Sequence, residues 1–174
     1  MSSSTRVLVY LLRRDLRLAD NPIFNEIARL NSQSQKPFTH LLPVYAFPAE
    51  QVETSGFLTE GAKSPYPEAR SYVGRFWRCG RLRSQFLAES VWDLKKDLEN
   101  VGSGLEIRTG KVKDVVKSIL NGYRDREDVE VHGVWMTSEE AWEEKYEEEE
   151  VEKLASAENI DFTLWPDEKY FVDE

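Results

Sequence analysis

The stretch VLVYLL, from Val7 to Leu12, decides the fold of this sequence, together with the charged turn RRDLRLADNP that follows it. A continuous apolar run without alternation is typical of a parallel strand that is covered on both faces. Asn21 is a favoured helix N-cap and Pro22 suits the first helical position, so a helix is predicted to start there. A buried strand, a turn and a helix in this order indicate an α/β domain.

The same alternation of strand and helix continues along the chain. Apolar runs predict further strands at residues 41–47, 105–108, 131–137 and 162–165, and apolar periodicity predicts helices at 22–31, 87–98 and 112–120. The sequence TSEE, from Thr137 to Glu140, fits a capping box that opens a last helix ending near Ala157. Because the strands are joined by crossovers, we predict a Rossmann-like five-stranded parallel sheet with helices on both faces. Residues 48–80 lack periodicity and are predicted to form a long irregular excursion.

Composition narrows the class of protein. The 174 residues suit one domain, and 23 basic against 32 acidic side chains give a formal net charge of −9. This charge argues against a nucleic-acid coat or a membrane-surface protein. The single cysteine, Cys79, excludes an internal disulfide and a cysteine-based zinc site, and two histidines are too few for a histidine-rich metal centre. We expect an intracellular protein of the cytoplasm or nucleus, with an organelle not excluded.

Candidate ligand residues lie where the predicted strands end. The sequence has neither the GxGxxG nor the P-loop glycine pattern, so autonomous binding of NAD or ATP is not expected. In parallel sheets, ligands bind beyond the carboxyl ends of the strands, near the switch in strand order. The residues expected at that edge are Arg13, Arg14, Asp15, Phe47, Ser138 and Glu139. No catalytic residue and no metal ligand is predicted.

Two interpretations stay open for each charged group. The alternating charges of Arg13, Asp15, Arg17 and Asp20 fit either a salt-bridge network that fixes the turn or direct contact with a ligand. Glu139 could bind a ligand or simply favour a helix N-terminus. The acidic stretch 139–152 is predicted to be a solvated helix face.

The segment between Lys63 and Arg83 is rich in arginine and aromatic residues. Such a mixture can bind nucleic acid by phosphate contact and stacking. The favoured alternative is a loop that packs its aromatic side chains inward and turns its arginines toward a partner domain.

Several motifs together resemble the photolyase/cryptochrome family. LRRDLRLADN, at residues 12–21, resembles the FRxDLRxxDN turn of the family, and LPVYAF, at 42–47, resembles its second strand. The segment 80–111 is similar to the long helix and third strand of DASH-type cryptochromes. The insertion SPYPEARSYVGRFWRCG, at 64–80, and the ending LWPDEKYFVDE resemble the fungal branch of that subgroup. The resemblance covers essentially residues 1–174.

This resemblance implies a light-harvesting α/β domain that seats a methenyltetrahydrofolate antenna. Matching VWMTSEEAWEE to the family pattern VYxHEEVTxEE implies that Glu139 contacts the pterin ring, with Ser138 where the family has Gln or Glu. Arg14, where the family often has Asn, and Asp15 lie in the first turn, and Phe47 matches a strand-two aromatic residue. A carboxylate suits the adjacent N–H donors of a pterin.

The FAD-binding helical domain of the family is not part of these 174 residues. FAD and DNA are therefore expected only in a full-length form, and antenna binding by the isolated chain is expected to be weak or absent. The first hypothesis is the N-terminal domain of a DASH-type cryptochrome, a blue-light photoreceptor or FAD-dependent photolyase of pyrimidine dimers, not catalytic alone. The alternative is a non-catalytic interaction module of the same fold that binds a helical partner.

Overall fold

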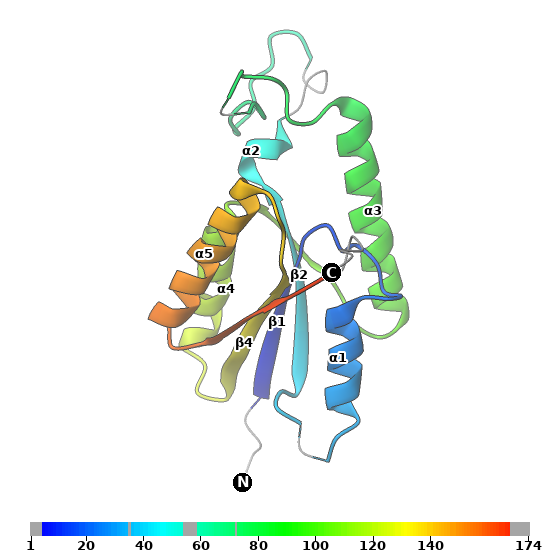
Figure 1. The fold of residues 1–174 in the computed structure, drawn as a ribbon, viewed down its shortest axis with the longest axis vertical. Coiled ribbons are helices and arrows are strands. Elements are labelled where there is room, and N and C mark those ends of the chain that lie inside the picture. Colours follow the sequence, from blue (N-terminus) through cyan, green and yellow to red (C-terminus); the bar gives the residue numbers. More distant parts are fainter. Residues whose placement is uncertain (1–4, 35, 54–58, 72, 168–174) are drawn as a thin grey trace, which may run out of the picture.

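The computed structural model describes residues 5–34, 36–53, 59–71 and 73–167. Five strands form one sheet in the order β3-β2-β1-β4-β5, and every neighbouring pair is parallel. The predicted five-stranded parallel α/β fold is confirmed (Figure 1). The elements in chain order are β1 (Thr5–Leu12), α1 (Pro22–Asn31), β2 (His40–Pro48), α2 (Ala49–Val52), α3 (Arg81–Asn100), β3 (Glu106–Gly110), α4 (Val112–Arg124), β4 (Val129–Thr137), α5 (Trp142–Ala157) and β5 (Asp161–Trp165).

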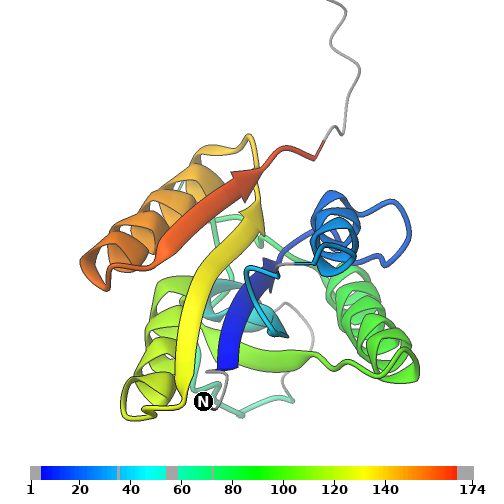
Figure 2. The ribbon, with the colours of Figure 1, turned by 90° about the horizontal axis from the view of Figure 1, so that it is seen from below.

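Helices cover both faces of the sheet, as Figures 1 and 2 show. Alternate residues of β1 supply the two cores, because successive strand side chains point to opposite faces. Val7, Val9 and Leu11 pack with residues of α4 and α5, whereas Leu8, Tyr10 and Leu12 pack with residues of α1 and α3. All six side chains are buried, which explains why the run VLVYLL shows no alternation.

The start of α1 follows the local sequence. The side chain of Asn21 accepts hydrogen bonds from the backbone N–H groups of Ile23 and Phe24, both at 3.0 Å, and Pro22 is the first helical residue. This is the predicted N-cap, and it satisfies donors that a helix start leaves unpaired. The turn between β1 and α1 is thereby fixed at its far end.

The predicted capping box at residues 137–140 is wrong. Helix α5 begins at Trp142, and its N-cap, Ala141, provides no side-chain hydrogen bond. Thr137 is the last residue of β4, and the N–H of Ser138 donates to the carbonyl of Trp165 at the end of β5. Thr137 therefore pairs with Trp165 within the sheet and does not act as a helix N-cap.

The segment between β2 and α3 has little regular structure in its described part. The short helix α2 follows β2 directly, and isolated bridges join Glu53 to Glu68 and Arg70 to Trp77. Residues 54–58 and Tyr72 of the predicted excursion, and residues 168–174 of the quoted ending, lie outside the described residues. Among the helices in the described ranges, none has the length and apolar character needed to cross a membrane.

Candidate ligand site at the carboxyl edge of the sheet

The strand order reverses between β1 and β4. From β1 the chain proceeds outward through β2 to β3 on one side, and β4 and β5 occupy the other side. The carboxyl ends of β1 and β4 are direct neighbours, since Leu11 pairs with Met136. A switch of this kind is where open α/β sheets bind ligands. The structure thus brings together the residues that follow β1 and those that follow β4, as predicted.

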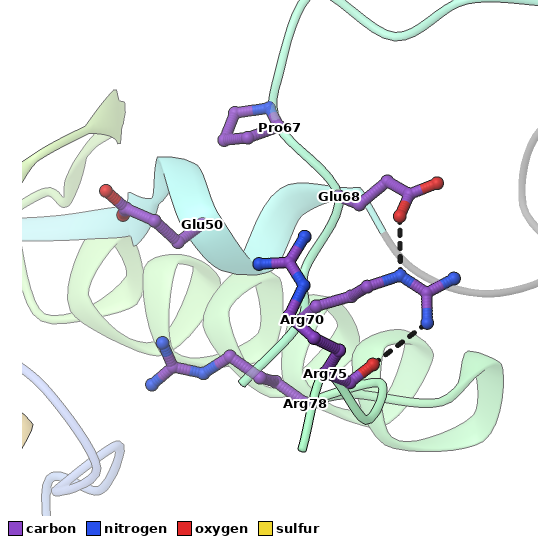
Figure 3. Close-up of a pocket in the computed structure, with 6 residues that line it drawn as sticks. All are labelled: Glu50, Pro67, Glu68, Arg70, Arg75 and Arg78. Atoms are coloured by element: carbon purple, nitrogen blue, oxygen red, sulfur yellow. Dashed lines mark hydrogen bonds and ion pairs between the residues drawn. The ribbon is translucent and has the colours of Figure 1, made fainter. Parts of the chain in front are cut away.

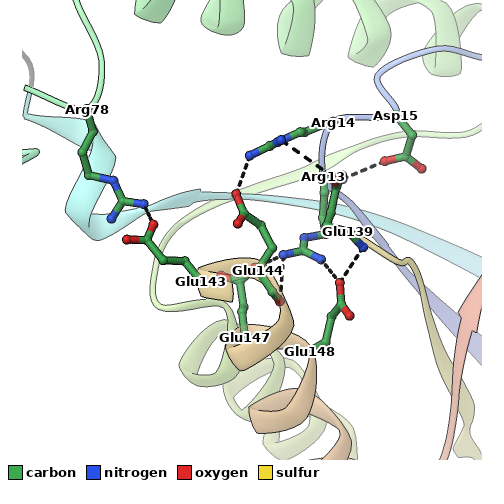
Figure 4. A network of polar contacts seen from close by, with 9 residues as sticks. All are labelled: Arg13, Arg14, Asp15, Arg78, Glu139, Glu143, Glu144, Glu147 and Glu148. Carbon is green, nitrogen blue, oxygen red and sulfur yellow. Dashed lines mark hydrogen bonds and ion pairs between the residues drawn. The ribbon is translucent and has the colours of Figure 1, made fainter. Parts of the chain in front are cut away.

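Arg13 leaves the end of β1 toward α5 (Figure 4). Its Nη1 donates to Oε1 of Glu148 at 2.6 Å, and its Nη2 donates to Oε2 of Glu147 at 2.9 Å and to the carbonyl of Glu144 at 3.2 Å. The side chain of Arg13 is 9% exposed. Arg13 is therefore committed to the protein itself, and it ties the β1–α1 turn to α5.

Arg14 lies on the outer side of the same network. It forms an ion pair with Glu144, and its Nη1 lies 3.8 Å from Oε2 of Glu139. More than half of the Arg14 side chain is exposed, whereas Glu139 is 5% exposed. The two predicted ligand residues therefore face each other across the switch point, one exposed and one buried.

The acidic stretch is only in part the solvated helix face that the sequence predicted, since Glu140, Glu149 and Glu152 are exposed but one side of α5 is not. Glu144, Glu147 and Glu148 are spaced so that they share one side of α5, and this side meets the two arginines. Glu148 is buried, and burial raises the pKa of Glu147 above its usual range although Arg13 opposes the shift. A further ion pair joins Glu143, on the same helix, to Arg78 in the segment before α3.

The backbone N–H of Glu139 and that of the residue before it both donate hydrogen bonds. The N–H of Glu139 donates to Oε1 of Glu148 at 2.8 Å, and the preceding N–H, of Ser138, donates to the carbonyl of Trp165 at 2.9 Å. The next residue, Glu140, has an 87% exposed side chain that pairs with Lys145. The consecutive residues Glu139 and Glu140 thus differ in exposure, since the first is buried and the second is exposed.

Asp15 points away from this edge toward α1. It is fully buried, accepts hydrogen bonds from the hydroxyl of Tyr10 and from the N–H of Arg13, and lies near the amide of Asn21. Burial, together with the Asp15 charge, raises the pKa of Tyr10 above its usual range. Asp15 is thus used to fix the turn, and Arg17 does the same by pairing with Asp167 at 2.9 Å.

Phe47 lies at the carboxyl end of β2, near Tyr45. The two rings meet edge to face with 4.9 Å between centroids. Burial raises the pKa of Tyr45 to about 12, an effect that Glu147 strengthens and Arg14 opposes. Tyr45 and Phe47 therefore form an aromatic pair at the carboxyl end of β2.

A separate hollow of about 460 Å³ lies beyond β2 (Figure 3). Two of its arginines already have carboxylate partners, because Arg70 pairs with Glu68 and Arg78 with Glu143. Phe76 is exposed, so the prediction that the aromatic residues of this segment pack inward is wrong for it. The lining residues are Glu50, Pro67, Glu68, Arg70, Arg75 and Arg78.

Comparison with known proteins identifies the family. The family model described as DNA photolyase matches residues 8–170. The chain belongs to the DNA photolyase family. Its fold agrees with this, since it superposes on the crystal structure of a Synechocystis cryptochrome with a TM-score of 0.69 at 21% identity, covering 95% of this chain and 28% of that one.

Within the DNA photolyase family, the chain is similar to fungal cryptochrome DASH proteins. It is 51% identical over 172 residues to a putative cryptochrome DASH of Gibberella zeae, and 49% identical over 168 residues to a putative mitochondrial cryptochrome DASH of Neurospora crassa. The matches cover 99% and 97% of this chain but 24% and 22% of those proteins. The chain therefore spans about a quarter of the length of these relatives.

The sequence of this photolyase-family domain did not predict that Arg13 and Arg14 pair with acids of α5. The acids at positions 144, 147 and 148 have helical spacing, which was a usable signal that they share one face. Nothing local to the sequence indicates that this face meets residues 13 and 14, some 130 positions away. Among the described residues, no group of three or more histidine, cysteine, aspartate or glutamate side chains is arranged so that it could hold a metal ion.

Proposed function

We propose that this chain is the antenna-seating α/β domain of a DASH-type cryptochrome and that Glu139 receives the pterin edge of methenyltetrahydrofolate. The observation that carries the proposal is the buried carboxylate of Glu139 at the strand-order switch. Its exposed neighbour is the long side chain of Arg14. A carboxylate in such a place is an acceptor for two adjacent N–H donors.

The residues present fit a pterin at this edge. Glu139 offers the acceptor oxygens, Ser138 lies beside it, and Phe47 supplies an aromatic wall near the β2 end. Arg14 borders Glu139 and is long and exposed, so it can turn aside or reach the acidic tail of a folate. When bound, the antenna supplies light absorption and energy transfer, and the chain supplies its seat and orientation. Asp15 contributes indirectly by fixing the turn that carries Arg14.

The chemistry of the whole protein is part of the proposal. Because the chain spans about a quarter of its fungal relatives, we place FAD and any light-driven splitting of pyrimidine dimers in a further, helical part. We assign no catalytic residue to these 174 residues. The compartment is proposed to lie inside the cell, and one fungal relative is described as mitochondrial.

A second candidate function is a docking module for a helical partner. Leu82 and Phe86 lie one turn apart near the start of α3 and are 83% and 71% exposed. An apolar pair of this kind favours contact with another helical surface. The two candidates differ in one respect, because only the first requires the chain to bind a folate at Glu139.

Titration with methenyltetrahydrofolate, followed by its absorption and fluorescence, tests the proposal. We expect any binding by the wild type to be weak and saturable, and to fall by about tenfold or more in Glu139→Gln, since hydrogen bonds to a charged group contribute roughly 1.5–3 kcal/mol. The matched control is Glu140→Gln, which makes the same change at an exposed side chain. Equal affinity of the wild type and Glu139→Gln would contradict the antenna role.

A further inference from the structure

Two distant segments meet at one carboxylate oxygen of α5. Oε1 of Glu148 accepts from Nη1 of Arg13 at 2.6 Å and from the backbone N–H of Glu139 at 2.8 Å, as the dashed lines of Figure 4 show. The Glu148 side chain is 8% exposed. Hydrogen bonds to an ionised acceptor are about twice as strong as neutral ones, and water does not compete well at a buried site.

This contact decides where Glu139 can lie. The connection between Thr137, which ends β4, and Trp142, which begins α5, is short, and no helix cap holds it. Its first N–H, from Ser138, is tied to β5, and its second, from Glu139, is tied to Glu148. Since the backbone N–H of Glu139 and that of the residue before it are both hydrogen-bonded, the side chain of Glu139 starts from a restrained backbone at the carboxyl edge.

Glu147 provides the comparison that separates positioning from simple packing. It lies next to Glu148 on α5 and binds the same arginine, Arg13, at 2.9 Å. Glu147 accepts a hydrogen bond from that arginine, whereas Glu148 accepts one from the arginine and one from the backbone N–H of Glu139. Removing either acid disturbs the ion-pair network, but only the removal of Glu148 also takes away the acceptor of the Glu139 N–H.

We propose that Glu148 is a positioning residue that holds Glu139 in place for the ligand of the switch point. This inference rests on the proposed function, because it is the antenna that Glu139 is held for. Glu148 does not touch the ligand. It acts by accepting the hydrogen bond of the Glu139 N–H. By accepting a second one from Arg13, it also holds the β1–α1 turn next to Glu139.

The first test measures Glu139 itself, without any folate. Amide hydrogen exchange of the Glu139 N–H is followed by NMR in the whole chain for the wild type, Glu148→Ala and Glu147→Ala. We expect exchange to be faster by about tenfold or more in Glu148→Ala and to stay within about threefold of the wild type in Glu147→Ala, because only the former loses the acceptor.

The second test measures folate affinity in the same proteins. Glu148→Ala is expected to weaken binding by about tenfold, because a small displacement of a binding group is costly, while Glu147→Ala stays within about twofold. Glu148→Gln keeps an oxygen acceptor and the side-chain size, so it should retain most of the affinity. If the alanine variant does not fold, Glu148→Met, which has a similar length and no oxygen acceptor, replaces it in both measurements with the same expected losses.

The outcomes separate the two proposals. Faster Glu139 exchange together with weaker folate binding in Glu148→Ala alone supports the positioning role. Equal effects of the Glu147 and Glu148 variants in both measurements would overturn it, while leaving the Glu139 proposal intact. Equal folate affinity of the wild type and Glu139→Gln would instead contradict the proposed function, and Glu139 exchange would then decide alone whether Glu148 holds that backbone.

Discussion

Glu139 and Glu140 show how far one position along the backbone changes what a carboxylate can do. Glu139 is buried beside Arg14, and its N–H is held by Glu148, whereas Glu140 extends into solvent and pairs with Lys145. An ion pair at an exposed site contributes little because water screens it. The two carboxylates therefore differ in exposure and in partners, and the buried one is the one that we propose as the ligand residue.

The contribution of Glu147 to the free energy of unfolding is expected to depend on pH. Burial raises its pKa in the folded state, so the folded protein binds a proton more readily there than the unfolded chain does. The stability linked to this group is then present at low pH and falls as pH rises through the raised pKa. We expect Glu147→Gln to gain stability relative to the wild type at about pH 7 and to lose that advantage toward about pH 4.

Urea unfolding of both proteins at several pH values measures this difference. Glu149→Gln is a suitable control, because Glu149 is exposed on the same helix and pairs with Lys153. A difference between Glu147→Gln and the wild type that stays constant across the range would contradict the prediction.

At the scale of elements, Arg13 joins β1 to α5. Its guanidinium contacts two carboxylates and one carbonyl of that helix and is almost fully buried. The helix begins without a side-chain cap, so this contact is one of the interactions that fix its first turns. The β1–α1 turn, α5 and the Glu139 connection consequently behave as one unit.

Removal of this arginine should therefore be costly. We expect Arg13→Ala to lower the free energy of unfolding by about 3 kcal/mol or more, because breaking a buried ion pair leaves charges unpaired. The control, Arg29→Ala, removes an exposed pair with Glu26 on α1 and should cost less than about 1 kcal/mol. Similar losses in the two variants, measured by chemical denaturation, would show that the Arg13 network does not hold α5.

The elements differ in how well the sequence predicts them. Val7–Leu12 and the Asn21-Pro22 start of α1 were predictable because a buried run and an N-cap are local signals. The start of α5 was not, since Thr137 satisfies a capping pattern in sequence while the sheet already uses it as a strand end. Competition between a local motif and a nonlocal pairing leaves no trace in the sequence around it.

For the whole molecule, the strand order does most to create the candidate site. Alternating strands and helices predicted a parallel sheet, and the residues at its carboxyl edge followed from that prediction. The pairing of Arg13 and Arg14 with α5 did not follow, because it depends on how one helix lies over the edge. The apolar residues exposed on α3, and the greater length of the fungal relatives, fit a domain that works with a further part.

A crystal structure of the chain grown with methenyltetrahydrofolate would test the central claim most directly. We expect the pterin edge to lie within hydrogen-bond distance of the Glu139 carboxylate, with Arg14 turned away from its position 3.8 Å from that group. Folate bound elsewhere on the domain, with Glu139 still covered by Arg14, would contradict the account.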